Sequence, residues 1–233
     1  MLTTEQLQKY ASNKFFSEAL HIYDPSKLDF NLLGQGEYNI NYVFTHPDNG
    51  KKLVLRLNTG SQMHLPNQIE YEYHALKLLE NSKRTPKAFF VDGSRKYIDF
   101  GVLVMEFLSG VPLDYKTDLS LAASCLADIH KTNISDSTSL IKPKNPLKAI
   151  LQECDAMAKK YLNSELADAF VGDKLKRMIS AAARLPLDKE DDGNCIINTE
   201  LNSGNFLING AGGRNYLIDW EKPIIGEAAQ DIA

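Results

Sequence analysis

Several features that assign a function quickly are missing from this 233-residue sequence. Its three cysteines, Cys125, Cys154 and Cys195, are odd in number and widely spaced, which argues against a disulfide framework. No apolar run approaches the roughly 20 residues that a membrane helix needs. The polar beginning, MLTTEQLQKYASNKF, also lacks the apolar core of a signal peptide. We therefore expect a cytoplasmic protein that has no membrane partner.

The charge balance and the missing motifs exclude further classes. The net charge is −4, so there is no excess of basic residues to favour a nucleic-acid partner. Neither the G-x-S-x-G elbow of many hydrolases nor the G-x-x-x-x-G-K-[ST] phosphate loop occurs. The five histidines are not spaced as metal ligands. The run DKEDDGN at 188–194 has Thr199 where a calcium loop needs Glu, which favours a solvated acidic turn.

The first half of the chain carries patterns that predict strands and one long helix. Apolar alternation predicts two strands around a glycine turn in FNLLGQGEYNINYVFT, and further strands in KKLVLRLN, KAFFVD and YIDFGVLVMEFL. The spacing of apolar residues predicts a helix in NQIEYEYHALKLLENS. A capping-box pattern of Thr3 and Gln6 predicts an opening helix over residues 3–20. This half is therefore expected to be rich in strands.

The second half has a different character. Helical spacing appears in LSLAASCLADIHKT, NPLKAILQECDAMAKKYL and SELADAFVGDKLKRMISAAARL, and three short apolar runs, CIIN, NFLIN and NYLIDW, come near the end. We place the change near Gly110, which gives a strand-rich lobe at 1–109 and a helical lobe at 110–233. The predicted fold class is α+β with two lobes.

Two features of the first half could contact a nucleotide. Gly34 and Gly36 would let backbone amides approach a phosphate, although a two-glycine turn is also an ordinary hairpin turn. Arg56 interrupts an apolar strand, where a buried cation needs a partner. Glu72 in the next helix is the candidate partner, and Glu70 is the second choice. The alternative is an edge-strand arginine that points at water.

A third feature is the apolar strand VLVMEFLSG. Its side chains around Met105 would form a flat apolar slot, and the backbone from Glu106 to Leu108 could bind a planar base. Taken alone, the same pattern is typical of a core strand.

The most specific pattern lies in NTELNSGNFLI and YLIDWE. Glu200 precedes Asn205 by five positions, and Asp219 follows the next apolar run. Phosphoryl transfer requires oxygen ligands for a divalent metal and a carboxylate near the attacking hydroxyl group. Asn205 and Asp219 suit the metal, and Glu200 could orient or deprotonate the acceptor.

Taken in order, these segments resemble the aminoglycoside phosphotransferase and choline kinase family, small-molecule kinases with a protein-kinase-like fold. LGQGEYNINYVF looks like the family's glycine hairpin, including Asn39, and LVLRL looks like the strand that bears the phosphate-binding cation, here Arg56. YEYHALKLL resembles the helix whose Glu72 pairs with that cation, and LVMEFLSGVPL is similar to the adenine-binding hinge. IDWEKPIIGEAAQDIA is close to the metal-binding segment, so the resemblance implies that Asp219 holds magnesium and that Asp231 braces the catalytic loop.

The chain departs from the family pattern in two places. The usual loop, H-x-D-x-x-x-x-N, reads NTELNSGN here, with Asn198 for His and Glu200 for Asp. Glu keeps the carboxylate but adds a methylene, and a misplacement of about 1 Å can cost on the order of 10²-fold in rate. Family members also continue beyond the DIA segment with several helices, whereas this sequence stops at Ala233. We therefore expect a C-terminal lobe that lacks its last helices.

The resemblance implies that the protein uses ATP and Mg²⁺ to phosphorylate a hydroxyl group of a small molecule, such as an amino sugar or amino alcohol. The alternative is a catalytically silent, nucleotide-binding pseudokinase or scaffold. Neither an acceptor nor an oligomeric state follows from the sequence. The predicted site comprises Glu200 as the catalytic residue, Asn205 and Asp219 as metal ligands, and Gly34, Gly36, Asn39, Arg56, Glu72, Glu106 and Leu108 at the nucleotide.

Overall fold

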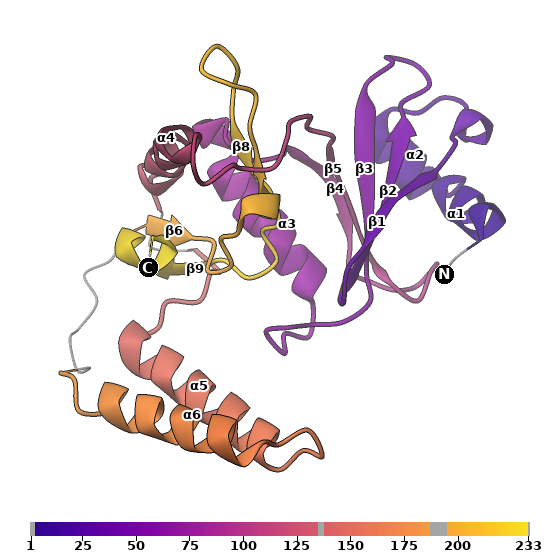
Figure 1. Ribbon diagram of the computed structural model, residues 1–233. Coiled ribbons are helices and arrows are strands. Elements are labelled where there is room, and N and C mark those ends of the chain that lie inside the picture. Colours follow the sequence, from indigo (N-terminus) through magenta and orange to yellow (C-terminus); the bar gives the residue numbers. More distant parts are fainter. Residues whose placement is uncertain (1–2, 135–137, 187–194, 233) are drawn as a thin grey trace.

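The fold, seen in a computed structural model that describes residues 3–134, 138–186 and 195–232, has a strand-rich N-terminal part and a mainly helical C-terminal part (Figure 1). The N-terminal part contains α1 (Thr4–Ala11), α2 (Lys14–Leu20), β1 (Asn31–Gln35), β2 (Asn39–Thr45), β3 (Lys52–Asn58), α3 (Gln68–Leu79), β4 (Ala88–Asp92) and β5 (Gly101–Glu106). Two short 3-10 helices, Pro25–Lys27 and Glu80–Ser82, lie between these elements. The predicted α+β class is confirmed.

The C-terminal part is built from helices and short strand pairs. It contains α4 (Leu119–His130), α5 (Pro146–Leu162), α6 (Ala169–Ala182), β6 (Cys195–Ile197), β7 (Phe206–Leu207), β8 (Tyr216–Leu217) and β9 (Ile224–Gly226). The 3-10 helices Ser203–Asn205 and Ala228–Asp231 complete it. The sequence predicted three short strands near the end and missed β9, which pairs with β6. The acidic run predicted as a turn at 188–194 lies outside the described residues.

The opening helix is divided in two, so the prediction of one helix over residues 3–20 is wrong. Its beginning is as predicted, because Thr3 and Gln6 form both bonds of a capping box. Polar side chains then end the helix: Ser12 Oγ donates to the Gln8 carbonyl at 2.8 Å, and Asn13 Nδ2 donates to the Tyr10 carbonyl at 2.9 Å. Such local bonds compete with helix continuation.

One antiparallel sheet in the order β1-β2-β3-β5-β4 forms the centre of the N-terminal part. Alternation along β3 assigns its side chains to two cores, because successive residues point to opposite faces. Leu55 and Leu57 pack in the cluster that includes the first two helices, whereas Val54 packs in the cluster that includes α3. By the same alternation, Arg56 lies on the face of Val54, toward α3 and the C-terminal part.

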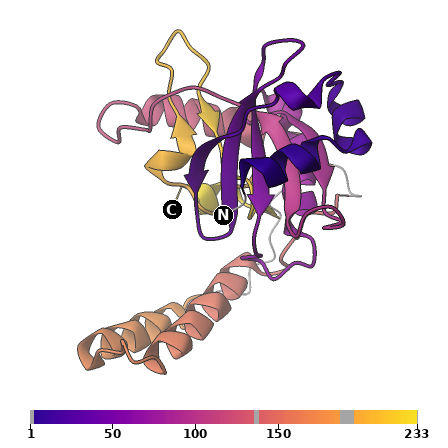
Figure 2. The ribbon, with the colours of Figure 1, turned by 90° about the vertical axis from the view of Figure 1, so that its right-hand side faces the viewer.

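A short connection joins the two parts. Strand β5 ends at Glu106, and Val111 already pairs with Ile208 in the C-terminal part. The predicted boundary near Gly110 falls in this connection and stays a prediction. Helices α5 and α6 form a hairpin that projects from the rest of the molecule (Figures 1 and 2).

Across the described ranges, no helix combines the length and the apolar character that spanning a membrane requires. The cytoplasmic location predicted from the sequence stays a prediction.

Candidate active site

A cavity of about 430 Å³ lies between the sheet and the C-terminal part. Its apolar wall is formed by Leu33, Val54, Leu76, Met105, Leu207 and Ile218. Three charged side chains, Arg56, Glu72 and Asp219, line it as well, and the connection from Glu106 to Gly110 forms another side. Ligand sites in proteins commonly combine an apolar slot with a few converging polar groups. This cavity therefore suits a ligand that has a flat apolar portion and a charged portion.

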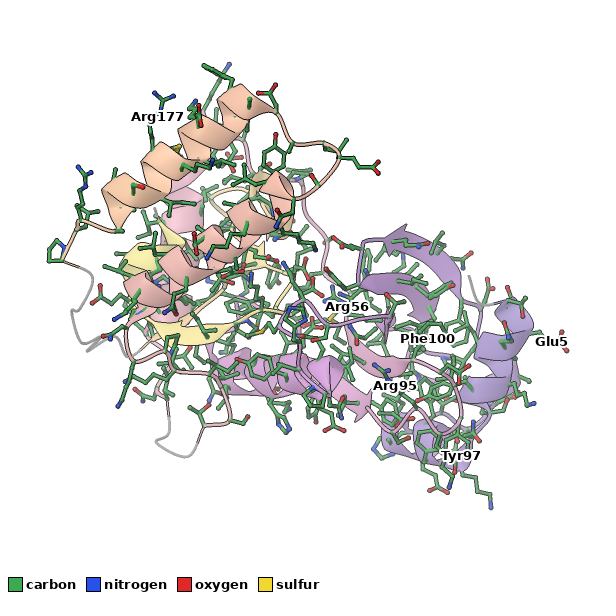
Figure 3. All side chains as sticks on the ribbon, turned by 90° about the horizontal axis from the view of Figure 1, so that it is seen from below. Glu5, Arg56, Arg95, Tyr97, Phe100 and Arg177 are labelled. Carbon is green, nitrogen blue, oxygen red and sulfur yellow. The ribbon has the colours of Figure 1, made fainter. Side chains whose placement is uncertain are left out.

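Arg56 of β3 lines this cavity and forms ion pairs with two carboxylates there. Its side chain points from the sheet toward the C-terminal part (Figure 3). Its Nη1 is 2.5 Å from Glu72 Oε1 and 3.2 Å from Asp219 Oδ1, and its Nε donates to Asn41 Oδ1 at 3.0 Å. The ion pair predicted between Arg56 and Glu72 is therefore present. The edge-strand alternative is wrong, because β3 lies between β2 and β5 and Arg56 is buried.

Burial alone would lower the pKa of the Arg56 guanidinium, but attraction to Glu72 and Asp219 raises it above its usual value. Burial also raises the pKa of the Glu72 carboxyl, and the nearby guanidinium partly offsets that rise. Removing either partner would leave a charge in a site with little water to solvate it. The pair is thus a fixed positive and negative charge at one end of the cavity.

The connection after β5 offers backbone N–H donors to the cavity. The N–H of Glu106 donates to the Lys87 carbonyl at 2.8 Å, and the N–H of Phe107 donates to the Lys52 carbonyl at 3.3 Å. The N–H of Leu108 has no hydrogen-bond partner among the residues that the structure describes, and Leu108 lines the cavity. Binding of a planar base at Glu106 and Leu108 stays a prediction, with the Leu108 N–H as an available donor.

The glycine turn lies outside the residues that line the cavity. Gly36 N donates to the Asn39 carbonyl at 2.8 Å and closes the β1–β2 turn, and a side chain at Gly34 would meet no atom within 4 Å. Asn39 is buried, where its Nδ2 donates to Glu221 and its Oδ1 accepts a bond of 3.1 Å from Asn58. Nucleotide binding by Gly34, Gly36 and Asn39 stays a prediction.

Glu221 is a buried carboxyl that the sequence reading did not select. Burial raises its pKa to about 7, and the negative charges of Asp219 and Glu72 act in the same direction. Its backbone carbonyl accepts a bond from Gln68 Nε2 of α3, and nearby the Tyr71 hydroxyl donates to the Pro223 carbonyl at 2.6 Å. The segment from 219 to 223 is therefore hydrogen-bonded to the N-terminal part at several points.

The loop after β6 carries the departure from the family pattern. Asn198, in place of His, donates from Nδ2 to the Asp219 carbonyl at 2.8 Å and accepts from the Glu200 N–H at Oδ1 at 3.2 Å. Thr199 and Asp219 both have positive φ angles, 69° and 65°. Such strained backbone is kept where the surroundings enforce it, and it often marks functional sites. Asn198 therefore joins the two segments that carry Glu200 and Asp219.

Asp231 holds the start of the same loop. Its buried carboxylate accepts bonds of 3.0 Å from the N–H groups of Asn198 and Thr199, and it lies 2.8 Å from His130 Nε2 at the end of α4. These are the contacts expected of a residue that braces the loop.

The predicted metal ligands lie on adjacent segments. The Ile218 N–H donates to the Asn205 carbonyl at 2.8 Å, which places Asn205 beside the residue before Asp219. Asn205 Nδ2 donates to the Glu200 carbonyl at 3.0 Å, so its Oδ1 is available to a cation. No group of three His, Cys, Asp or Glu side chains suited to a metal occurs within the described ranges. One amide and one carboxylate oxygen fit Mg²⁺, which usually takes few protein ligands and completes its shell with phosphates and water.

Glu200 contacts residues that the sequence did not indicate. Its Oε1 accepts a bond of 2.6 Å from Gln62 Nε2 and lies 3.8 Å from Lys222 Nζ. Gln62 belongs to a loop without periodicity, so no pattern could have selected it. Asn41 was detectable, because it lies two positions from Asn39 on one strand and therefore on the same face.

The family model described as "Phosphotransferase enzyme family" matches residues 29–233. No curated protein matches the chain.

Solved structures resemble the chain at low sequence identity. A choline kinase from Cryptosporidium parvum Iowa II is 16% identical with a TM-score of 0.70, over 99% of this chain and 68% of that one. A Plasmodium vivax ethanolamine kinase is 16% identical with a TM-score of 0.66, over 96% and 64% of the two chains. A spectinomycin phosphotransferase in complex with ADP and spectinomycin is 17% identical with a TM-score of 0.57, over 88% and 66%. The matches thus span about two thirds of those longer chains, and they confirm the predicted kinase-like fold.

Proposed function

The chain belongs to the phosphotransferase enzyme family, and on that premise we propose that it transfers the γ-phosphoryl group of ATP to a hydroxyl group of a small molecule. The observation that carries the proposal is the composition of the cavity. An apolar slot beside the Leu108 N–H and a charged group of Arg56, Glu72 and Asp219 occur in one space of about 430 Å³. ATP has the matching parts, a flat base and a chain of phosphates.

Each polar residue of the site has a role in this proposal. The Leu108 N–H binds the base, and Arg56 attracts the phosphates while Glu72 keeps its side chain in place. Asn205 and Asp219 would hold Mg²⁺, which when bound neutralises the charge of the phosphate oxygens. Because Arg56 already contacts Asp219, the phosphate-binding cation and a metal ligand are held side by side.

Glu200 is proposed as the residue that faces the acceptor. The acceptor oxygen attacks the γ-phosphorus, the bond from that phosphorus to the β–γ bridging oxygen breaks, and ADP leaves. The hydroxyl proton passes to the Glu200 carboxylate. General-base assistance of this kind contributes on the order of 10²–10⁴-fold to a rate.

The names of the structural relatives suggest where to search for the acceptor. They include kinases named for choline and ethanolamine and a phosphotransferase that is complexed with spectinomycin. We propose a hydroxyl-bearing amine, such as an amino alcohol or amino sugar, as the acceptor class.

The proposal can be tested in two steps. Calorimetric titration with ATP and ADP, with and without Mg²⁺, should show binding that strengthens with the metal. Transfer from ATP to choline, ethanolamine and spectinomycin is then followed by ADP release. Glu200→Gln should lower transfer about 10²-fold or more and leave nucleotide affinity unchanged. The exposed Glu5, on the far side of the N-terminal part (Figure 3), supplies the control Glu5→Gln.

The outcomes separate the two functions considered from the sequence. Absence of any nucleotide binding would contradict both. Mg²⁺-dependent binding without transfer to a broad panel of hydroxyl-bearing amines would identify a nucleotide-binding module that is catalytically silent. Transfer that survives Glu200→Gln would remove Glu200 from the mechanism.

A further inference from the structure

The side chain of Glu200, which is longer than the Asp of the usual loop, contacts two residues outside the 198–205 loop. We propose that Gln62 and Lys222 are positioning residues for phosphoryl transfer: they fix Oε1 of Glu200 and leave Oε2 to face the acceptor hydroxyl. This inference rests on the transfer reaction proposed above.

Both contacts to the Glu200 carboxylate are made to the same oxygen, Oε1. Gln62 Nε2 donates to Glu200 Oε1 at 2.6 Å, and Lys222 Nζ lies 3.8 Å from the same oxygen. Among the described parts of the chain, no residue forms a hydrogen bond with Oε2. The Glu200 side chain is about one-third exposed, so an acceptor can reach this oxygen.

The backbone of Glu200 is fixed independently of its side chain. Its N–H donates to Asn198 Oδ1 at 3.2 Å, and its carbonyl accepts from Asn205 Nδ2 at 3.0 Å. Thr199 Oγ1 also donates to the Lys222 carbonyl at 2.8 Å. With the main chain held on both sides, the torsions of the side chain are the remaining freedom.

That freedom is larger for Glu than for the Asp of the usual loop, because Glu has one more rotatable bond. Freezing a side chain has an entropic cost, and a loss of position of about 1 Å can reduce a rate on the order of 10²-fold. Contacts at one carboxylate oxygen therefore provide what the longer side chain lacks, a defined position for the other oxygen.

The two contacts come from different parts of the molecule. Gln62 lies in the loop between β3 and α3, and Lys222 follows the buried Glu221. Lys222 Nζ is also 3.4 Å from Glu153 Oε1 on α5, so its ammonium group lies between two carboxylates. Glu153 thus restrains Lys222. The position of the Glu200 carboxylate therefore depends on Gln62 of the N-terminal part and on Lys222 of the C-terminal part.

A double-mutant cycle with Glu200→Asp tests the proposal. The shorter Asp side chain withdraws its carboxylate from Gln62, so the two positions should be coupled. We expect Gln62→Leu to lower kcat about 10-fold in the wild-type background and less than about 2-fold in the Glu200→Asp background. KM for ATP, the ADP dissociation constant and Tm should not change. The exposed Gln152 supplies the control Gln152→Leu.

The same cycle with Lys222→Met serves if Gln62→Leu does not fold, and Lys222→Arg should restore at least part of the rate because it keeps the charge. Turnover is measured as ADP release with choline, ethanolamine or spectinomycin, or with water where none of the three reacts. Equal losses from Gln62→Leu in both backgrounds, or no loss in either, would overturn the positioning role while the proposed function stands. A wild-type protein that transfers to none of a broad panel of hydroxyl-bearing amines and does not hydrolyse ATP would refute the proposed function and the positioning role with it.

Discussion

Replacing Arg56 with Met would remove the cation from a site that contains two carboxylates. Met has a similar length and no charge, so the main change is electrostatic. Arg56 Nη1 lies 2.5 Å from Glu72 and 3.2 Å from Asp219. The Glu72 side chain is only 2% exposed, whereas that of Asp219 is 33% exposed. Water can therefore solvate Asp219 after the substitution, but Glu72 would be left as a buried charge without a partner.

This difference in exposure determines how much folding stability Arg56→Met should lose. Breaking a buried ion pair by removing one partner costs about 3–5 kcal/mol. Because only one of the two carboxylates is fully buried, we expect the lower end, about 3 kcal/mol. For a protein of this size that corresponds to a fall in Tm of roughly 6–12 °C. The double variant Arg56→Met/Glu72→Leu should recover at least half of the loss, because an apolar pair of similar volume needs no solvation.

The assay is urea unfolding followed by circular dichroism and by the fluorescence of Trp220, the only tryptophan, which is buried beside the cavity. The loss in the single variant should be greater at pH 8 than at pH 5. Burial raises the pKa of Glu72, so its folded form holds a proton more tightly than the unfolded chain does, and stability falls as pH rises above the unfolded pKa. A single variant as stable as the wild type, or a double variant no better than the single, would refute this account of the pair.

Two further predictions concern residues at the edges of the site. Burial raises the pKa of Glu221 from 4.5 to about 7, so the folded state binds its proton more strongly and stability declines as pH rises through this window. Glu221→Gln should therefore be more stable than the wild type at pH 8, by at most about 3 kcal/mol, and little different at pH 4, as read from urea midpoints; a larger advantage at pH 4 would contradict the assignment. Gly110→Ala should lose about 2 kcal/mol in thermal denaturation, because its φ is 157° and the added Cβ would lie 2.8 Å from the Leu207 backbone carbon. Gly212→Ala is the matched control, since a Cβ there meets no atom within 4 Å and its φ is not positive.

Periodicity explains which parts of this structure could be predicted. Arg56 was recognised because a charge inside an apolar strand needs a partner, and the following helix offered Glu72 at the right face. Most strands and helices followed from alternation and helical spacing in the same way, with β9 as an exception. The division of the first helix did not, because the capping box marks its beginning only and the bonds of Ser12 and Asn13 are read from the structure.

The contacts that complete the site could not be predicted for a different reason. Gln62 reaches Glu200 from a loop, and Lys222 reaches it from a segment about twenty positions later, so no local pattern relates them. For Asn39, the residue was selected from the sequence but its side-chain partners were not predicted. Its place in the glycine hairpin led us to predict a nucleotide contact, which stays a prediction, but it gave no sign that the side chain would be buried and bonded to Glu221 and Asn58. Side-chain partners across a cleft depend on tertiary packing, which spacing does not encode.

The hydrogen bonds of the 219–223 segment have a consequence for how a ligand could enter. The segment is bonded to the sheet side through Asn39, Gln68 and Tyr71, and to the loop after β6 through Asn198. If the two parts moved apart as rigid bodies, the segment would lose either its bonds to the sheet side or its bond to the loop after β6. Each lost hydrogen bond would cost about 1 kcal/mol.

Strand β1 is held differently. It is one of the two edge strands of the sheet, its one partner among the described strands is β2, and its register shifts between Leu32 and Gly34. Leu33, which lines the cavity from this strand, is half exposed. A displacement of this edge strand would open the Leu33 side of the cavity and leave the hydrogen bonds of the 219–223 segment intact, so we expect a ligand to enter on this side.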